Sequence, residues 1–185
     1  DALTATTEML GRAQAGGSEV TLEQCLDNFS ICEELSKDDW VYCRETKNFE
    51  KSFKKLDVWS VPEMLIVHLK RFGRERLTGP MEKIDTLVRF PMQLDMSPWV
   101  RGPLDNRGAV YSLYATVNHS GAMGHGHYTA YARVGEGAQR SWFYFNDPMV
   151  SATDEANLVS KSAYILFYER QDGTAAQSTA SHEKK

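Results

Sequence analysis

Apolar residues recur at helical spacing near the start of the chain. Four of them stand at positions i, i+3, i+4 and i+7 and lay one apolar stripe along a short helix: Leu22, Cys25, Leu26 and Phe29. The segment Thr21-Leu22-Glu23-Gln24 has the capping-box pattern, so the helix should begin directly after Thr21. Because Cys25 falls on the stripe, we expect it to pack as a small hydrophobic residue.

Strand patterns dominate the rest of the chain. Residues 64–72 begin as a continuous apolar run and end in alternation, which predicts a strand that is buried on both faces and then emerges. Residues 110–117 alternate, and one side of that strand should carry Tyr111, Leu113, Ala115 and Val117. Further strands are expected at residues 128–134, 142–145 and 163–168.

One short helix is expected among these later strands. A Ser-x-x-Asp start at Ser151 and Asp154 predicts a helix within residues 151–160, with Ala156 and Val159 facing a core. Because strands dominate the second half and the helices are set apart from them, the pattern indicates an α+β fold with a largely antiparallel sheet.

The two ends of the chain differ in composition from its middle. Residues 1–18 are rich in Ala, Thr and Gly and predict a linker or the remnant of an insertion. Residues 171–185 contain no large apolar side chain, so burial cannot offset the entropy of ordering and we expect a flexible tail. The folded part is then residues 19–170, the usual size of one domain.

Composition narrows the class of protein and its partners. The chain has 185 residues, 42% of them apolar, which is enough to bury one sizeable core. A net charge of −4 without a basic stripe argues against nucleic acid, and no apolar run approaches the roughly 18 residues of a membrane span. We therefore expect no nucleic-acid partner and no membrane partner. The odd number of cysteines does not resemble a disulfide framework, so a cytoplasmic or nuclear compartment fits best: Cys25, Cys32 and Cys43.

The densest cluster of chemically active side chains lies in a glycine-rich stretch between two predicted strands. It holds three of the five histidines, His119, His125 and His127. Imidazoles at this spacing are possible metal ligands, although no carboxylate or cysteine ligand stands close by in the sequence. A glycine-rich surface loop with solvated histidines is the other explanation of this stretch taken alone.

Asn146 and Asp147 follow an aromatic strand, and Asn146 stands nineteen positions after His127. A histidine acts as a general base only when its other ring nitrogen is held, and the side-chain oxygen of Asn or Asp can accept the Nδ1 proton to do so. Two neighbouring strands would bring these residues together in the Cys-His-Asn arrangement of thiol peptidases. The alternative is that Asn146-Asp147-Pro148 simply makes a turn.

Six ordered segments carry a resemblance to a known family. They are residues 54–62 (KKLDVWSVP), 67–72 (VHLKRF), 111–121 (YSLYATVNHSG), 126–131 (GHYTAY), 142–147 (WFYFND) and 159–168 (VSKSAYILFY). Together they resemble the ubiquitin-specific proteases, thiol-dependent deubiquitinases whose catalytic domain is likened to a hand with thumb, palm and fingers. The resemblance implies half of a papain-like cysteine peptidase fold, mostly antiparallel sheet, with residues 19–55 in the fingers and residues 56–170 in the palm.

The same resemblance implies a role for each site residue. His127 would be the general base, Asn146 would orient it, and Asp147 would assist or substitute. Ubiquitin or a ubiquitinated protein would be the partner, and four residues match positions that line the channel for its C-terminal tail: Phe72, His119, Gly126 and Tyr128.

Two departures from the family pattern shape these expectations. No cysteine lies in a Gly-Asn-Thr-Cys box, so the nucleophile should come from an upstream half of the catalytic domain, which is then a second partner. Cys43-Arg44-Glu45-Thr46 retains one sulfur of a Cys-x-x-Cys zinc pair, so we expect neither a metal nor another cofactor. With that half, the chain would cleave after the terminal glycine of ubiquitin. The alternative is a catalytically inactive ubiquitin-binding or scaffold module.

Overall fold

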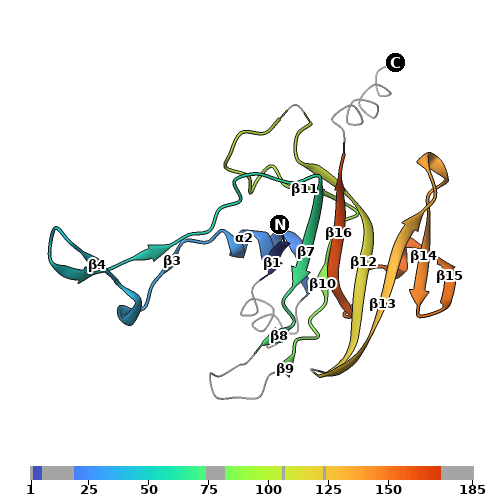
Figure 1. The fold of residues 1–185 in the computed structure, drawn as a ribbon, viewed down its shortest axis with the longest axis horizontal. Helices are drawn as coiled ribbons and strands as arrows, with labels where there is room; N and C mark the ends of the chain where they lie inside the picture. The colour runs from blue at the N-terminus through green and yellow to red at the C-terminus, as the bar shows by residue number, and fades with distance from the viewer. Residues whose placement is uncertain (1, 6–18, 74–81, 106, 123, 172–185) are drawn as a thin grey trace.

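The structure is a computed structural model that describes residues 2–5, 19–73, 82–105, 107–122 and 124–171. Its centre is an eight-stranded sheet in the order β1-β7-β16-β12-β13-β14-β15, with β11 also pairing with β12 (Figure 1). These strands are β1 (Ala2–Ala5), β7 (Met64–Leu69), β11 (Gln93–Asp95), β12 (Val110–Ala122), β13 (His125–Val134), β14 (Ser141–Asn146), β15 (Met149–Thr153) and β16 (Ala163–Arg170). All of the pairings are antiparallel except that of β1 with β7. The predicted α+β class with a largely antiparallel sheet is confirmed.

The hydrophobic core lies between one face of this sheet and helix α2 (Leu22–Phe29). The capping box is present, since Thr21 Oγ1 accepts from the Gln24 N–H at 3.2 Å and Gln24 Oε1 accepts from the Thr21 N–H at 2.9 Å. Cys25 is 2% exposed, so its prediction as a packed hydrophobic residue is confirmed. The helix is also tied to the body of the domain, because Trp99 Nε1 donates to Asp27 Oδ1 at 2.9 Å.

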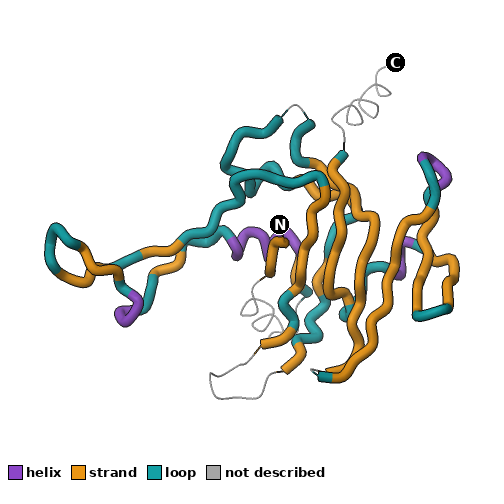
Figure 2. The backbone as a smooth tube through the Cα atoms, viewed as in Figure 1, coloured by secondary structure: helices purple, strands orange, loops and turns teal. Residues whose placement is uncertain are grey.

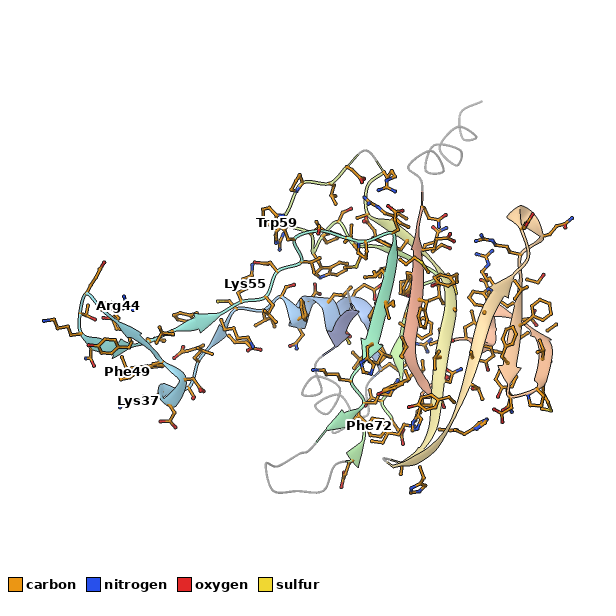
Figure 3. All side chains as sticks on the ribbon, in the orientation of Figure 1. Lys37, Arg44, Phe49, Lys55, Trp59 and Phe72 are labelled. Atoms are coloured by element: carbon orange, nitrogen blue, oxygen red, sulfur yellow. The ribbon has the colours of Figure 1, made fainter. Side chains whose placement is uncertain are left out.

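A narrow arm leaves the domain directly after α2 (Figure 2). It consists of β3 (Glu33–Glu34) paired with β6 (Phe53–Lys54), and β4 (Val41–Cys43) paired with β5 (Asn48–Glu50), with a 3₁₀ turn at Lys37–Asp39. Figure 3 places Lys37, Arg44 and Phe49 towards its far end. Within the range expected to be fingers, α2 therefore packs with the sheet, and only the later residues form the arm.

Two short pairings complete the described strands. β2 (Val20–Thr21) runs parallel to β10 (Val88–Arg89), and β8 (Phe72–Gly73) is antiparallel to β9 (Glu82–Lys83). The second pair matters for the site, because it holds Phe72 at the end of the sheet (Figure 3).

The burial patterns of two strands differ from those predicted. In β7 only alternate residues are buried, and Met64 is exposed, so the prediction of a start buried on both faces is wrong. In β12, Tyr111 and Leu113 are buried as expected, but an irregularity between Leu113 and Ala115 shifts the register. A β-bulge adds one residue and reverses which side chains face the core. Thr116 is therefore buried, whereas Ala115 and Val117, which were expected to be buried, are only partly buried.

Residues 151–160 also differ from the prediction. Ser151 pairs with Tyr144 inside β15, and the turn that follows is a 3₁₀ segment, Glu155–Asn157, whose N-cap Asp154 makes no side-chain capping bond. Ala156 is exposed, and Leu158 is buried in its place. Pairing with β14 satisfies the backbone of Ser151, so the helix start expected there does not form.

The predictions for the two ends of the chain can be compared with the structure only in part. Residues 2–5 form β1, whose partner is the outer edge of β7, so these four residues are a strand where a linker was predicted. Residues 6–18 and 172–185 lie outside the described part of the chain. Within the described residues, no helix has the length and apolar character needed to cross a membrane.

Candidate active site

His127, near the start of β13, meets Asn146, the last residue of the neighbouring strand β14. β13 and β14 pair from Val134 with Ser141 to Ala130 with Phe145, which leaves Asn146 one position beyond the last pair. His127 lies three positions further along β13, within side-chain reach of a diagonal neighbour. The ring Nε2 of His127 lies 2.6 Å from Asn146 Oδ1. The structure therefore brings together the two residues that the sequence placed nineteen positions apart.

The identity of the bonded nitrogen decides what His127 can do. An amide oxygen only accepts hydrogen bonds, so the Nε2 atom facing Asn146 Oδ1 carries the proton. In the neutral ring Nδ1 is then the unprotonated nitrogen and can accept a proton. The sequence-based expectation that Asn would hold Nδ1 is wrong; Asn146 holds Nε2, and the basic nitrogen is Nδ1.

Asp147 begins the two-residue loop that joins β14 to β15, with Pro148 as its second residue. Its φ of 48° lies in the left-handed region, whereas proline cannot adopt a positive φ. A positive φ at the first loop residue alone is the pattern of a type II′ turn. Asn146-Asp147-Pro148 is thus both a turn and part of the site. In the described part of the chain, Asp147 is exposed and makes no hydrogen bond with His127.

The four residues expected to line a ubiquitin-tail channel converge around His119. The His119 ring is 4% exposed, and its centroid lies 4.7 Å from that of Tyr128 and 5.6 Å from that of Phe72. Gly126 lies against the same ring, because a Cβ atom built there would be 2.1 Å from His119 Nε2. Tyr128 is 56% exposed and leaves one side of this aromatic cluster open to a ligand.

Tyr164 is a member of the aromatic cluster that sequence reasoning missed. Its ring centroid lies 4.7 Å from His68 and 5.9 Å from His119. Its position depends on the antiparallel pairing of β16 with β12 and on a hydrogen bond from His119 N–H to Ser162 C=O of 2.8 Å. The spacing of aromatic residues along the sequence does not encode this long-range register.

The environment of His119 disfavours protonation of its imidazole. Burial lowers the pKa of His119, and the nearby Lys83 ammonium lowers it further. Lys83 Nζ donates to the His119 carbonyl at 2.7 Å. Among the described residues His119 Nδ1 is buried and has no hydrogen-bond partner, so the ring acts as a packing surface there.

Arg71 directly precedes Phe72 of this cluster, and sequence reasoning missed its role as well. Its guanidinium is fully buried and bonds to three backbone carbonyls. Nε donates to Ala163 at 2.6 Å, and Nη1 donates to Ile84 at 2.9 Å and to Thr86 at 2.8 Å. These bonds link the chain just before Phe72 to the start of β16, which carries Tyr164.

None of the described contacts joins a cysteine thiol to His127. Burial raises the pKa of Cys25 to about 11, which opposes thiolate formation, and in Figure 1 the strands β7, β16 and β12 stand between its helix α2 and β13. Cys32 is exposed after α2, and Cys43 lies on β4 in the arm. Hydrogen bonds from Thr46 lower the pKa of Cys43.

The metal-site explanation gains no support from the described residues, in which no three His, Cys, Asp or Glu side chains gather as metal ligands would. His125 is exposed at the β12–β13 hairpin, where it pairs with Ala122.

Known proteins resemble this chain over most of its length. The family model described as ubiquitin carboxyl-terminal hydrolase matches residues 14–168. Ubiquitin carboxyl-terminal hydrolase 15 of Rattus norvegicus is 46% identical over 155 residues, and ubiquitin carboxyl-terminal hydrolase 4 of Bos taurus is 45% identical over 154 residues. Each match covers 83% of this chain but only 16% of the relative.

Solved structures show the same fold. A structure of the SAGA Ubp8/Sgf11/Sus1/Sgf73 DUB module bound to ubiquitin aldehyde matches with a TM-score of 0.70 and 29% identity, over 92% of this chain and 36% of that chain. A yeast SAGA DUBm structure with a mutant Sgf73 matches with a TM-score of 0.71 and 31% identity, over 92% of this chain and 35% of that chain. The antiparallel sheet is thus part of a papain-like catalytic fold. By these matches, the chain belongs to the ubiquitin carboxyl-terminal hydrolase family, the ubiquitin-specific proteases, and covers part of the catalytic domain.

Proposed function

We propose that this chain supplies the general base of a cysteine-type deubiquitinase. The observation that carries the proposal is the 2.6 Å contact of His127 Nε2 with Asn146 Oδ1, which leaves Nδ1 free to take a proton. The nucleophilic thiol is supplied by a segment of the catalytic domain outside this chain. Burial of Cys25 and the place of Cys43 in the arm support this assignment.

The chemistry follows from that geometry. His127 Nδ1 removes the thiol proton, and the thiolate attacks the carbonyl carbon of the terminal glycine of ubiquitin. The imidazolium then protonates the leaving lysine amine, and water hydrolyses the thioester with His127 again acting as base. Asn146 holds the ring in the required tautomer throughout, and Asp147 is the adjacent group that can take over this role.

The aromatic cluster fits the tail of ubiquitin as the substrate. A buried His119 packed against an exposed Tyr128 presents an aromatic surface at the same end of β13 as His127. Gly126 allows an extended chain to approach the backbone closely, and a tail that ends in two glycines is the substrate that suits such a surface. A SAGA DUB module that resembles this chain binds ubiquitin aldehyde, which supports ubiquitin as the partner. The unpaired cysteines support action in the cytoplasm or nucleus.

The test is release of a fluorophore from the C-terminus of ubiquitin by the full-length protein. We expect His127→Ala to lower kcat/KM by about 10²–10⁴-fold, the usual contribution of a general base. Asn146→Ala should cost less, because Asp147 is adjacent. His125→Ala is the matched control, since His125 is exposed on the same strand and should leave activity unchanged.

Full activity of the His127→Ala protein would contradict the proposal. A wild-type protein that binds ubiquitin without hydrolysing the fluorophore would instead identify a ubiquitin-binding module.

A further inference from the structure

β15 is the last strand of the central sheet in the described part of the chain. Its five residues pair with β14 on one side, and its other side faces outward (Figure 1). Edge strands are usually protected by charges, proline or a covering element, yet β15 has the sequence MVSAT, with neither a charge nor a proline. Met149 is 63% exposed and Val150 is 56% exposed. An uncharged, open edge of this kind is suited to pairing with another extended chain.

The register shows which backbone groups are open. β14 and β15 are joined by a two-residue loop, so the flanking pair, Asn146 and Met149, is the hydrogen-bonded pair that closes the turn. Hydrogen-bonded and non-hydrogen-bonded pairs alternate along an antiparallel ladder. Ser151 and Thr153 therefore bond back to β14, whereas the N–H and C=O groups of Val150 and Ala152 point to the open side.

We propose that the open edge of β15 binds, by strand addition, an extended segment of the protein from which ubiquitin is removed. This inference rests on the proposed function and names the part of the substrate that lies beyond the scissile bond. Main-chain hydrogen bonds to Val150 and Ala152 provide the affinity, as in other cases of strand addition.

The edge is continuous with the candidate active site. Met149, the first residue of β15, pairs directly with Asn146, which holds His127. Neighbouring strands lie about 4.8 Å apart, so an added strand would run about 14 Å from β13, three spacings away with β14 and β15 between them. Two or three further residues, at about 3.3 Å each, and an extended lysine side chain bridge that gap. The lysine that carries ubiquitin would therefore follow the docked segment on the Met149 side.

The charges around the edge favour this occupant. The uncharged strand is bracketed by two exposed carboxylates, Asp147 at the active-site end and Asp154 at the far end. A segment with basic residues on either side of a short uncharged stretch complements this arrangement. The lysine that carries ubiquitin is an uncharged amide until it is released, so the complementary basic residues are others that neighbour it in the acceptor segment.

The experiment compares two substrates of the full-length protein. The first is ubiquitin joined to a fluorophore, which has no acceptor protein. The second is ubiquitin joined through an isopeptide bond to the lysine of a peptide whose neighbouring five residues are uncharged and rich in β-branched side chains. Val150→Pro deletes one outward N–H without removing a bond to β14. Val150→Thr is the matched control, since it keeps the N–H and the β-branched shape.

We expect Val150→Pro to lower kcat/KM on the peptide conjugate by roughly three- to tenfold, the effect of losing one hydrogen bond, and to leave the fluorophore substrate unchanged. Val150→Thr should behave as wild type on both. Thermal melting checks that the proline variant is folded, and Ala152→Pro replaces it if it is not.

Equal kinetics of Val150→Pro and wild type on the peptide conjugate would overturn the inference, as would an equal loss on both substrates. A concentration-dependent dimer that Val150→Pro abolishes would also overturn it, because the edge would then pair with a second copy. If wild type fails on the fluorophore substrate, the proposed function itself is wrong, so the two failures are distinguishable.

Discussion

Gly126→Ala tests the packing that joins the glycine-rich segment to the aromatic cluster. The φ of Gly126 does not lie in the left-handed region, so alanine is compatible with the backbone and the conflict is steric. A Cβ atom would stand 2.1 Å from His119 Nε2 and 2.7 Å from the Ser120 carbonyl oxygen. Ordinary contacts of a Cβ atom are 3.4 Å or more, so the His119 ring must move by more than an ångström. Because the ring is buried against Phe72 and Tyr128, that movement disturbs the whole cluster.

The expected loss of stability is about 1–3 kcal/mol for overpacking, less about 0.4–1 kcal/mol gained because alanine restricts the unfolded chain. The net of about 1–2 kcal/mol corresponds to a fall in Tm of about 2–8 °C for a chain of this size. Urea unfolding and thermal melting measure it directly. In the ubiquitin–fluorophore assay we expect KM to rise, since Tyr128 loses its contact with the displaced His119 ring.

Two further variants separate the steric cause of the Gly126→Ala effect from other causes of destabilisation. Gly124→Ala introduces a Cβ atom with nothing within 4 Å at a φ of 89°, so its cost comes from the backbone alone and should spare KM. In a His119→Ala background, Gly126→Ala should lose much of its effect, which gives a coupling energy of about 1 kcal/mol or more. The reasoning is refuted if Gly126→Ala is as stable and active as wild type, or if its cost is unchanged without the His119 ring.

Three further outcomes concern Arg71, the cysteines and His119. Arg71→Met should destabilise the fold by about 2–4 kcal/mol in urea unfolding, because three buried carbonyls lose their donor, and Arg71→Lys should recover part of it. At pH 8, iodoacetamide followed by mass spectrometry should label Cys43, whose pKa is lowered, well before Cys25, whose pKa is raised to about 11. The pKa of His119 is lowered on folding, so its contribution to stability is complete above the unfolded value of about 6.5 and is lost as the pH falls through the folded value. The unfolding free energy of His119→Gln should therefore change less between pH 7.5 and 5.5 than that of wild type.

Local patterns predicted the parts of the fold that local interactions determine. The capping box and apolar stripe of α2 depend on residues within eight positions, and both are present. The bulge in β12 and the loss of the helix expected at Ser151 depend on pairing with other strands. A period of two along the sequence cannot show where a partner strand forces an extra residue, so the alternation was right at Tyr111 and wrong after Leu113.

The site shows the same division. The proximity of His127 and Asn146 was predicted because their residue types and the strands that carry them are visible in the sequence. Arg71 and Tyr164 were not, because a buried arginine bonded to carbonyls has no sequence pattern and the position of Tyr164 is set by the register of β16. Both residues act through packing, which becomes visible only when distant strands are assembled.

The hairpin between β14 and β15 agrees with both explanations that the sequence offered for Asn146-Asp147-Pro148. A turn was the simpler explanation of Asn146-Asp147-Pro148, and a catalytic role was the other. In the structure the turn is what ends β14 at Asn146, one residue beyond the last pair with β13, where its amide reaches His127 Nε2. Pro148 removes a backbone donor and fixes the loop, while the left-handed Asp147 reverses the chain in two residues. A longer loop would let Asn146 move relative to β13, so the tight turn itself keeps the Asn146 amide within reach of His127 Nε2.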